Sequence, residues 1–317
     1  MDPLFASDTV LHLVMDTEVA QLVGDPHARA PSWIPMTLRY EDASGHTVSV
    51  RGEVRTAGRS RAARCRTPPL HWRLDADDAR GSLFEHHDLI RVTTHCQDKG
   101  EFENYVIEEY LIYRILNLLS PWSYRARLLQ LDYGGGNTHF AFVTEHETML
   151  AARTGWHPLE IERNLTRSEV EPNQTALLSV FAYLIGNTDY SPIAGPKNSR
   201  CCHNIQLIGE PDGPYIPVPY DFDSAGIISA PYAAPGESLP ITEVRQRYFW
   251  GYCEHRDYLP AILQRFVQAK PELYALYEEQ VGLDDRRKRK AIAYFDEFYR
   301  TIEREGRRRS QIVEACR

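Results

Sequence analysis

Two acidic residues, Asp221 and Asp223, flank a phenylalanine in the segment VPYDFDSAG (218–226), directly after a short apolar run. A carboxylate at the end of a strand that enters a core is costly unless it is paired or binds a cation. A second apolar run begins at Asn204 in CCHNIQLIG (201–209), and the turn signal EPDGP separates the two runs. The sequence therefore predicts a hairpin that brings Asn204 beside the two carboxylates.

Carboxylate and amide oxygens are the ligands that Mg²⁺, Mn²⁺ and Ca²⁺ prefer, so Asn204, Asp221 and Asp223 form a candidate metal site. Asp189, in GNTDYSP, follows an apolar helical segment. An isolated aspartate on a loop near such a site can accept or orient a hydroxyl proton, which makes Asp189 the candidate catalytic residue. The alternative for Asp189 is a turn residue that ends the helix, and for the acid pair it is a turn cap with a solvated partner.

The first half of the chain supplies complementary charge. Arg91 lies inside the strand-like run DLIRVTTH, and Glu108 and Glu109 lie in the helical segment that follows. A strand cation held by a helix glutamate, with a metal-binding acid elsewhere, is the arrangement of kinase-type phosphoryl transfer. We expect Arg91 to pair with Glu108, with Arg73 as the rival cation and Glu109 as the rival acid.

The loop RTAGRS, between two predicted strands, can cover phosphates through its backbone amides and the hydroxyl of Ser60. Together these segments resemble the CotH family of spore-coat and secreted kinases, which are atypical members of the protein-kinase-like superfamily. The resemblance rests on VRTAGRS, LIRVTTH, EYLIYRILNLL, GNTDY, the HN dipeptide before a strand, and VPYDFDSAG. It extends from about residue 5 to 230.

The resemblance implies an ATP-dependent kinase that uses Mg²⁺ or Mn²⁺. In this view Asp189 aligns the acceptor hydroxyl, while Arg91 and its partner Glu108 steady the α- and β-phosphates. The implied metal-binding residues are Asn204, Asp221 and Asp223. The implied residues of the phosphate loop are Arg55, Gly58 and Ser60.

The function expected from these residues is transfer of the γ-phosphoryl group of ATP to a hydroxyl acceptor on a protein or a small molecule. Two other functions stay open. One is a pseudokinase, a binding scaffold, because the phosphate loop contains one glycine (Gly58) and the HRD motif of ordinary kinases is absent. The other is the use of ATP for nucleotidyl transfer or ligation.

The order of predicted elements indicates an α+β protein with a two-lobed, protein-kinase-like fold. Residues 1–148 are mainly strands with one long helix at about 102–119, and residues 149–317 are mainly helices with two short strands. The first segment is the expected N-lobe and the second is the expected C-lobe. We expect the two lobes to form one structural unit.

Charge and hydropathy limit the partners. The 317 residues carry a net charge of −8, which argues against nucleic acid as a partner. No apolar stretch is long enough to span a membrane, and the start of the chain does not resemble a signal peptide. We expect a monomer or weak oligomer. The location is cytoplasmic unless a leader was removed, in which case an exported or periplasmic location stays open.

Cysteines and arginines raise further alternatives. Cys65 and Cys96 fall on predicted strands that we expect to pair in one sheet, so they can form a disulfide, which would favour an exported protein. A structural Ca²⁺ or Zn²⁺ protein is a competing class, because two further segments carry Cys and His; the candidate zinc ligands are Cys201, Cys202, His203, Cys253 and His255.

The aromatic segment RQRYFWGYC (245–253) is either a substrate surface or core packing with its two arginines at the rim, and we favour core packing. The basic runs at 286–290 and 307–309 lie in helical patterns rich in acids, so they are expected to be solvated helix faces.

Overall fold

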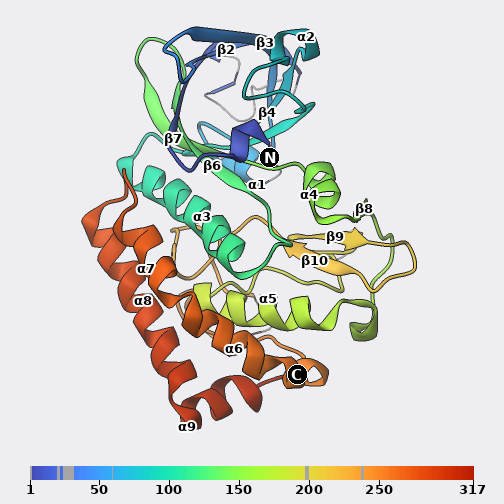
Figure 1. Cartoon of the computed structure of the whole chain (residues 1–317). Coiled ribbons are helices and arrows are strands. Elements are labelled where there is room, and N and C mark those ends of the chain that lie inside the picture. Colours follow the sequence, from blue (N-terminus) through green and yellow to red (C-terminus); the bar gives the residue numbers. More distant parts are fainter. Residues whose placement is uncertain (1, 20–21, 24–31, 59, 197–199, 237–238) are drawn as a thin grey trace. The chain divides into compact units, whose positions relative to one another are not determined.

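The computed structural model describes residues 2–19, 22–23, 32–58, 60–196, 200–236 and 239–317. The chain divides into two compact units (Figure 1). Unit 1 comprises residues 1–110 and 125–146, and unit 2 comprises residues 111–124 and 147–317. The long helix α3 (Gly100–Leu119) contributes its first half to unit 1 and its second half to unit 2.

Unit 1 is built on a barrel that closes in the order β1-β2-β3-β4-β5-β7-β6 (Figure 1). Its strands are β1 (Leu11–Thr17), β2 (Ile34–Glu41), β3 (Thr47–Thr56), β4 (Leu70–Leu74), β5 (Ile90–Thr93), β6 (Ala126–Asp132) and β7 (Thr138–Thr144). Neighbouring strands are antiparallel except β1 and β6, which run parallel and close the barrel. The unit also contains the short helices η1 (Pro3–Phe5), α1 (Ser60–Arg64) and α2 (Ala76–Ala79).

Alternation of apolar and polar residues sets the strand faces. In β2 the buried positions alternate with exposed or half-buried ones, as expected for a strand with one face on a core. Leu38, Val50, Val54 and Trp72 are fully buried in the resulting apolar core. Gly52 lies where β3 approaches β4, and a Cβ atom there would lie 2.4 Å from the Arg73 carbonyl oxygen. A side chain at this position would therefore force the two strands apart.

The expected two-lobed, protein-kinase-like fold is wrong, because a closed seven-stranded barrel does not fit it. The turn residues ASG (43–45) lie between the paired strands β2 and β3, and GGGN (134–137) lies between β6 and β7. The parallel pairing of β1 with β6 is what closes the sheet. It joins Leu11 to Leu129, and hydrophobic alternation within a strand carries no information about such a distant partner.

Unit 2 combines a three-stranded sheet with helices. The antiparallel sheet has the order β10-β9-β8, with β8 (His157–Leu159), β9 (Ile205–Gly209) and β10 (Ile216–Pro219). The helices are α4 (Glu147–Thr154), η3 (Arg167–Glu169), α5 (Pro172–Ile185), η4 (Cys253–Tyr258), α6 (Leu259–Gln268), α7 (Lys270–Glu278), α8 (Asp285–Glu303), α9 (Glu305–Arg308) and η5 (Arg309–Val313). Helix α4 ends at Thr154, and β8 follows it.

Helix α5 is the buried centre of unit 2 and ends beside the candidate site. Pro172 occupies its first turn and the Glu171 carboxylate caps it, which fixes where the helix begins. Gly186 ends it in the left-handed region at φ 69°, and a Cβ atom there would lie 2.1 Å from the Tyr294 hydroxyl. Glycine is therefore required at this position for both backbone conformation and space.

All six cysteines form disulfides: Cys65–Cys96, Cys201–Cys202 and Cys253–Cys316. The first pair is the one that the sequence suggested. The zinc alternative lacks its thiolate ligands, because each cysteine that it requires is bonded to another cysteine. Three disulfides are typical of a protein that matures in an oxidising compartment.

Among the helices of the described residues, none combines the length and apolarity that crossing a bilayer requires.

Candidate catalytic site

The loop that leaves α5 places Asp189. Asn187 accepts a hydrogen bond from the Asp189 backbone N–H through its side-chain Oδ1 at 2.9 Å, which forms a turn directly after the helix. Residues 189–191 then run antiparallel to the segment that precedes β9. Ser191 and His203 exchange backbone hydrogen bonds of 2.9 and 3.1 Å, and this pairing fixes the register of the two segments.

The register brings two side chains onto the Asp189 carboxylate. His203 Nε2 lies 2.6 Å from Asp189 Oδ1, and Asn204 Nδ2 donates to Asp189 Oδ2 at 3.2 Å and to its backbone carbonyl at 2.8 Å. Both carboxylate oxygens are thus held. The side chains of His203 and Asp189 are 34% and 43% exposed, so the pair stays accessible to solvent and to a ligand.

Asp221 and Asp223 follow β10, the strand that pairs with β9. Tyr220 donates its backbone N–H to the Asn204 carbonyl at 3.0 Å, so the hairpin pairing continues up to the candidate site. The Asp221 backbone N–H donates to the Tyr113 hydroxyl at 3.1 Å. Phe222 is buried against the rings of Tyr113 and Phe181, with centroids 4.8 and 5.7 Å away. The phenylalanine between the two aspartates therefore anchors the segment in the core.

Asp221 and Asp223 differ in their surroundings. Asp223 is buried, and the Ser224 hydroxyl donates to its Oδ1 at 3.3 Å. Asp221 is half-buried, and its charge helps to raise the pKa of His203. The largest cause of that raised pKa is the hydrogen bond from His203 to Asp189, which burial of the imidazole opposes. The negative charge of Asp189 and Asp221 thus favours a protonated His203.

Asn204 and Asp221 both adopt the left-handed backbone region, with φ of 50° and 60°. Residues other than glycine seldom adopt this region, although Asn and Asp tolerate it better than most. Strained backbone is concentrated at functional sites because surrounding contacts must hold it. Two such residues, close together at the end of one hairpin, mark this location as a candidate site independently of any motif.

The carboxylate and amide oxygens of Asp221, Asp223 and Asn204 are of the kinds that bind a hard divalent cation. Because the Asn204 amide nitrogen is used on Asp189, its Oδ1 is the oxygen left to accept, and no described residue donates to it. The described residues contain no group of three or more His, Cys, Asp or Glu side chains close enough to hold a metal. Mg²⁺ is commonly bound by one or two carboxylates together with substrate phosphates.

Unit 1 contains the other predicted residues. Arg91 is half-buried on β5, opposite His71 on β4 and Thr144 on β7, and Glu108 is buried on α3. Their pairing stays a prediction. The buried helix glutamate next to it, Glu109, receives Arg61 in an ion pair of 2.9 Å. Arg73, the rival strand cation, pairs with Glu53.

The predicted phosphate loop leads from β3 into α1. Arg55 is the penultimate residue of β3, and its guanidinium lies 4.6 Å from the ring centroid of Trp33. Gly58 adopts φ 83°, and the backbone N–H of Ala57 donates to Pro69 at 2.7 Å. Ser60 begins α1, and its side chain lies outside the described part of the structure. The role of Arg55, Gly58 and Ser60 in binding phosphate stays a prediction.

Sequence reasoning missed three side chains: His203, Tyr113 and Arg61. His203 was considered as a zinc ligand, but it contacts Asp189. The sequence feature that could have identified His203 as a site residue is its position next to Asn204. No local pattern connects Tyr113 with Asp221 or Arg61 with Glu109, because both contacts join segments far apart in the chain.

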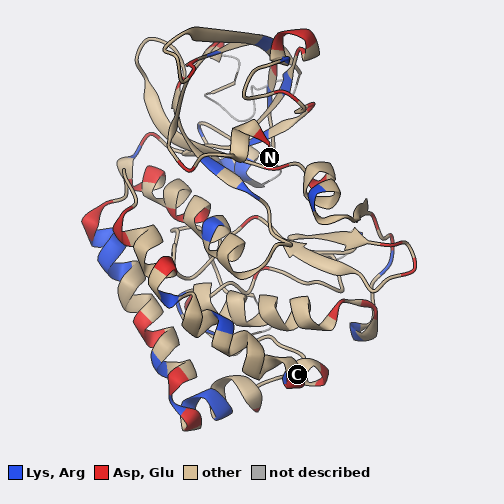
Figure 2. Cartoon of the chain, in the orientation of Figure 1, with Lys and Arg blue, Asp and Glu red and all other residues tan. Residues whose placement is uncertain are grey.

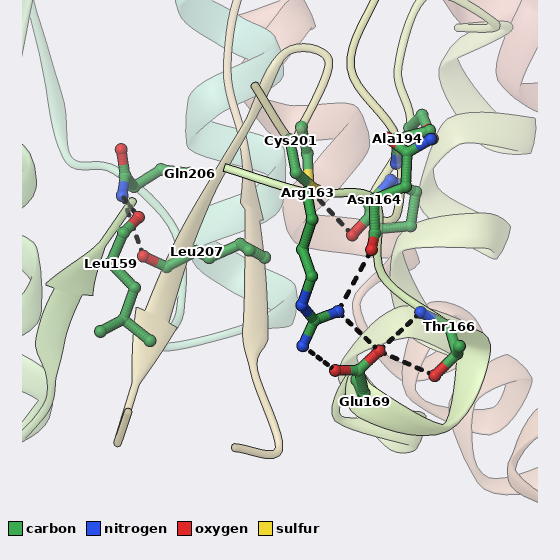
Figure 3. Close-up of a disulfide and its surroundings, with 12 residues drawn as sticks. Leu159, Arg163, Asn164, Thr166, Glu169, Ala194, Cys201, Gln206 and Leu207 are labelled. Atoms are coloured by element: carbon green, nitrogen blue, oxygen red, sulfur yellow. Dashed lines mark hydrogen bonds and ion pairs between the residues drawn. A yellow bond between two sulfur atoms is a disulfide. The ribbon is translucent and has the colours of Figure 1, made fainter. Parts of the chain in front are cut away.

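The loop between β8 and α5 lies beside the segment that leads to His203. Ile161 forms a backbone bridge to Cys201, and Gln206 donates to the Leu159 carbonyl at 3.0 Å. Figure 3 shows Arg163 extended toward Glu169, which also accepts hydrogen bonds from Thr166. These contacts position the Cys201–Cys202 segment and, with it, His203.

A scan against protein-family models found no match, and a search of curated proteins found none either.

Proposed function

We propose that this protein is an ATP-dependent and divalent-metal-dependent phosphotransferase whose chemistry takes place at Asp189, Asn204 and Asp221. The observation that carries the proposal is the convergence of these residues at the end of the β9–β10 hairpin. There Asn204 fixes the Asp189 carboxylate, and Asp221 lies just after the adjoining strand β10, which ends at Pro219. The motif resemblance to CotH kinases suggested the same residues, and the proposal needs the site rather than a kinase-like fold.

In the proposed reaction, Asp189 orients the acceptor hydroxyl and takes up its proton. The hydroxyl oxygen forms a bond to the γ-phosphorus, and the bond from that phosphorus to the β,γ-bridging oxygen breaks to release ADP. The hydrogen bond between His203 and Asp189, which raises the pKa of the imidazole, keeps that carboxylate in place. When bound, the metal would neutralise phosphate charge, and Asp221, Asn204 and Asp223 are the residues that would hold it.

The test is calorimetric titration with ATP, with and without Mg²⁺ or Mn²⁺, on the wild type and on Asp221→Asn. Asparagine keeps the shape of Asp221 and tolerates its positive φ, so the substitution removes mainly charge. We expect Mg²⁺-dependent ATP binding that weakens at least about tenfold in the variant, since a charge-assisted contact contributes roughly 1.5–3 kcal/mol. The matched control is Asp212→Asn, on the exposed turn between β9 and β10, which should bind like the wild type.

Product analysis then separates the reaction classes. ADP and a phosphorylated acceptor support the proposal, whereas AMP with a nucleotidylated acceptor or pyrophosphate would replace it with nucleotidyl transfer. Metal-dependent binding without turnover over a panel of peptide and sugar hydroxyl acceptors would indicate a binding scaffold. ATP binding that is unaffected by both metal and Asp221→Asn would overturn the proposed site.

A further inference from the structure

A polar cavity lies within unit 2, lined by Tyr183 of α5 and by residues from three further segments. Its volume is about 630 Å³, which is enough for a small organic ligand. The segment 245–247, the C-terminal end of α8 and the segment 307–311 all contribute to it. The polar side chains that matter are Arg245, Arg247, Arg300, Arg307, Gln246 and Gln311.

The charge of this cavity is strongly positive. Four arginines line it, and Glu297 is the single acidic residue among its described lining residues. Glu297 is paired with Arg247 at 3.3 Å, so the negative charge is already matched. Figure 2 shows basic and acidic segments alternating along α8 and α9, the helices that contain Arg300 and Arg307. The basic run at 307–309, expected to be a solvated helix face, thus places Arg307 in a cavity.

Arg247 has a structural role. It is largely buried over the ring of Tyr294 and donates to the backbone carbonyls of Tyr183, Leu184 and Tyr294. Phe249 and Tyr252 of the aromatic segment are buried as expected, but Arg247, which was expected at the rim, is largely buried with them. Its donors are used inside the protein and Glu297 matches its charge, so the unpaired positive charge of the cavity comes from the other three arginines.

Arg300 and Arg307 retain donors for a ligand. Arg300 is exposed and uses Nε on the carbonyl of Asp296, within its own helix. Arg307 is also exposed, and neither guanidinium pairs with a carboxylate of the described residues. Arg245 contributes a third guanidinium, which lies over Tyr294 and donates to the Gly226 carbonyl at 3.4 Å.

The side chains of Gln246 and Gln311 also present N–H donors to the cavity. Gln246 uses its Oε1 to accept from the backbone N–H groups of Thr242 and Glu243 at 2.7 and 3.1 Å. Gln311 uses its Oε1 to accept from the Tyr183 hydroxyl at 2.9 Å. In both cases the amide oxygen is occupied and the NH₂ group is the part left to donate. The cavity therefore offers N–H donors and few acceptors, which favours an anion.

We propose that this cavity binds a small phosphorylated compound. Planar guanidinium groups match the oxygen geometry of phosphate, and three of them without carboxylate partners call for a ligand with several negative charges. A phosphoryl group supplies nearly two charges and three acceptor oxygens in a small volume. The proposal does not depend on the catalytic role of Asp189 and Asp221.

The test is calorimetric titration with inorganic pyrophosphate in the presence of EDTA, which removes any metal-dependent binding at the catalytic site. Saturable binding is expected for the wild type and equally for Asp221→Asn. Arg300→Gln and Arg307→Gln should each weaken the affinity about tenfold. Arg286→Gln, an exposed arginine on the same helix α8 that does not line the cavity, should leave it unchanged.

Three results would overturn the proposal. Absence of saturable pyrophosphate binding would remove the site. Equal weakening by Arg286→Gln would reduce the binding to general attraction by the basic helices. Equal or tighter binding of citrate would show that the cavity recognises carboxylates instead of phosphoryl groups. Unchanged melting temperatures for the three exposed arginine variants would show that any loss of binding is local.

Discussion

Each of the two units contains an ion pair, and the two pairs differ in how far they are exposed to solvent. In unit 1, Arg61 and Glu109 lie 2.9 Å apart with side chains that are only 14% and 4% exposed. In unit 2, His203 and Asp189 lie 2.6 Å apart with side chains that are 34% and 43% exposed. The first pair is withdrawn from water, and the second remains open to it.

Burial decides what each pair does. Loss of one partner from a buried pair leaves an uncompensated charge in the interior, so such a pair has a large effect on folding when it is broken. A half-exposed pair is screened by water and contributes little to stability. The accessible pair can instead contact a substrate and exchange a proton. We infer that Arg61–Glu109 serves the structure of unit 1 and His203–Asp189 serves the function of unit 2.

The largest effect is expected from Arg61→Met, which keeps the apolar stem and removes the charge. It leaves the Glu109 carboxylate buried without this partner, so the free energy of unfolding should fall by about 3–5 kcal/mol. Urea unfolding followed by circular dichroism measures the change. Arg51→Met is the matched control, because Arg51 pairs with Asp78 on the exposed surface of the same unit and should change stability little.

A double variant tests the cause. If Arg61→Met acts by removing the charge that faces the Glu109 carboxylate, then Arg61→Met combined with Glu109→Leu should recover much of the lost stability, because that carboxylate is then absent as well. A double variant as unstable as the single one would contradict this explanation and would point to lost packing of the arginine stem.

The second-largest loss of stability is expected from removal of the Cys65–Cys96 disulfide of unit 1. Cys65 directly follows α1, the short helix that carries Arg61, and its bond to Cys96 closes a loop with a sequence separation of 31. Replacing both by alanine should reduce the free energy of unfolding by about 2–4 kcal/mol, because the unfolded chain regains the freedom of that loop. Urea unfolding under non-reducing conditions measures it.

The matched control is the double alanine variant of Cys201 and Cys202. These residues are adjacent in sequence, so their bond closes no loop of chain and its removal should have little effect on global stability. A larger loss from this pair than from Cys65 and Cys96 would reverse the comparison between the units. It would mean that the segment before His203 is the more important structural element.

Local patterns predicted much of what positions the candidate site. The hairpin of β9 and β10 followed from two apolar runs around a turn, and the structure pairs Ile205 with Pro219. Helix α5 followed from its apolar content and begins at Pro172. These features depend on residues close in sequence, where alternation, turn residues and helix caps are direct physical signals.

The rest depends on distant contacts that such patterns do not encode. Closure of the barrel requires Leu11 of β1 to pair with Leu129 of β6, and this pairing alone overturned the expected fold. The Asp221 backbone N–H finds its partner in Tyr113, far earlier in the chain. In both pairs, the sequence around one residue gives no indication of the other. These contacts therefore follow only from the three-dimensional packing of each unit.

The smallest effect is expected from His203→Gln, and it should depend on pH. The hydrogen bond to Asp189 raises the pKa of His203 above its ordinary value of 6.5. Its stabilising contribution is therefore fully present below that value and is lost as the pH rises through the raised pKa. The wild type should exceed the variant by less than about 1 kcal/mol at about pH 5.5, and the difference should vanish at about pH 9. Unfolding curves across this range measure it, and NMR titration of the imidazole locates the pKa. A difference that grew toward alkaline pH would mean that a neutral His203 is the stabilising form, and the proposed charged contact with Asp189 would then be rejected.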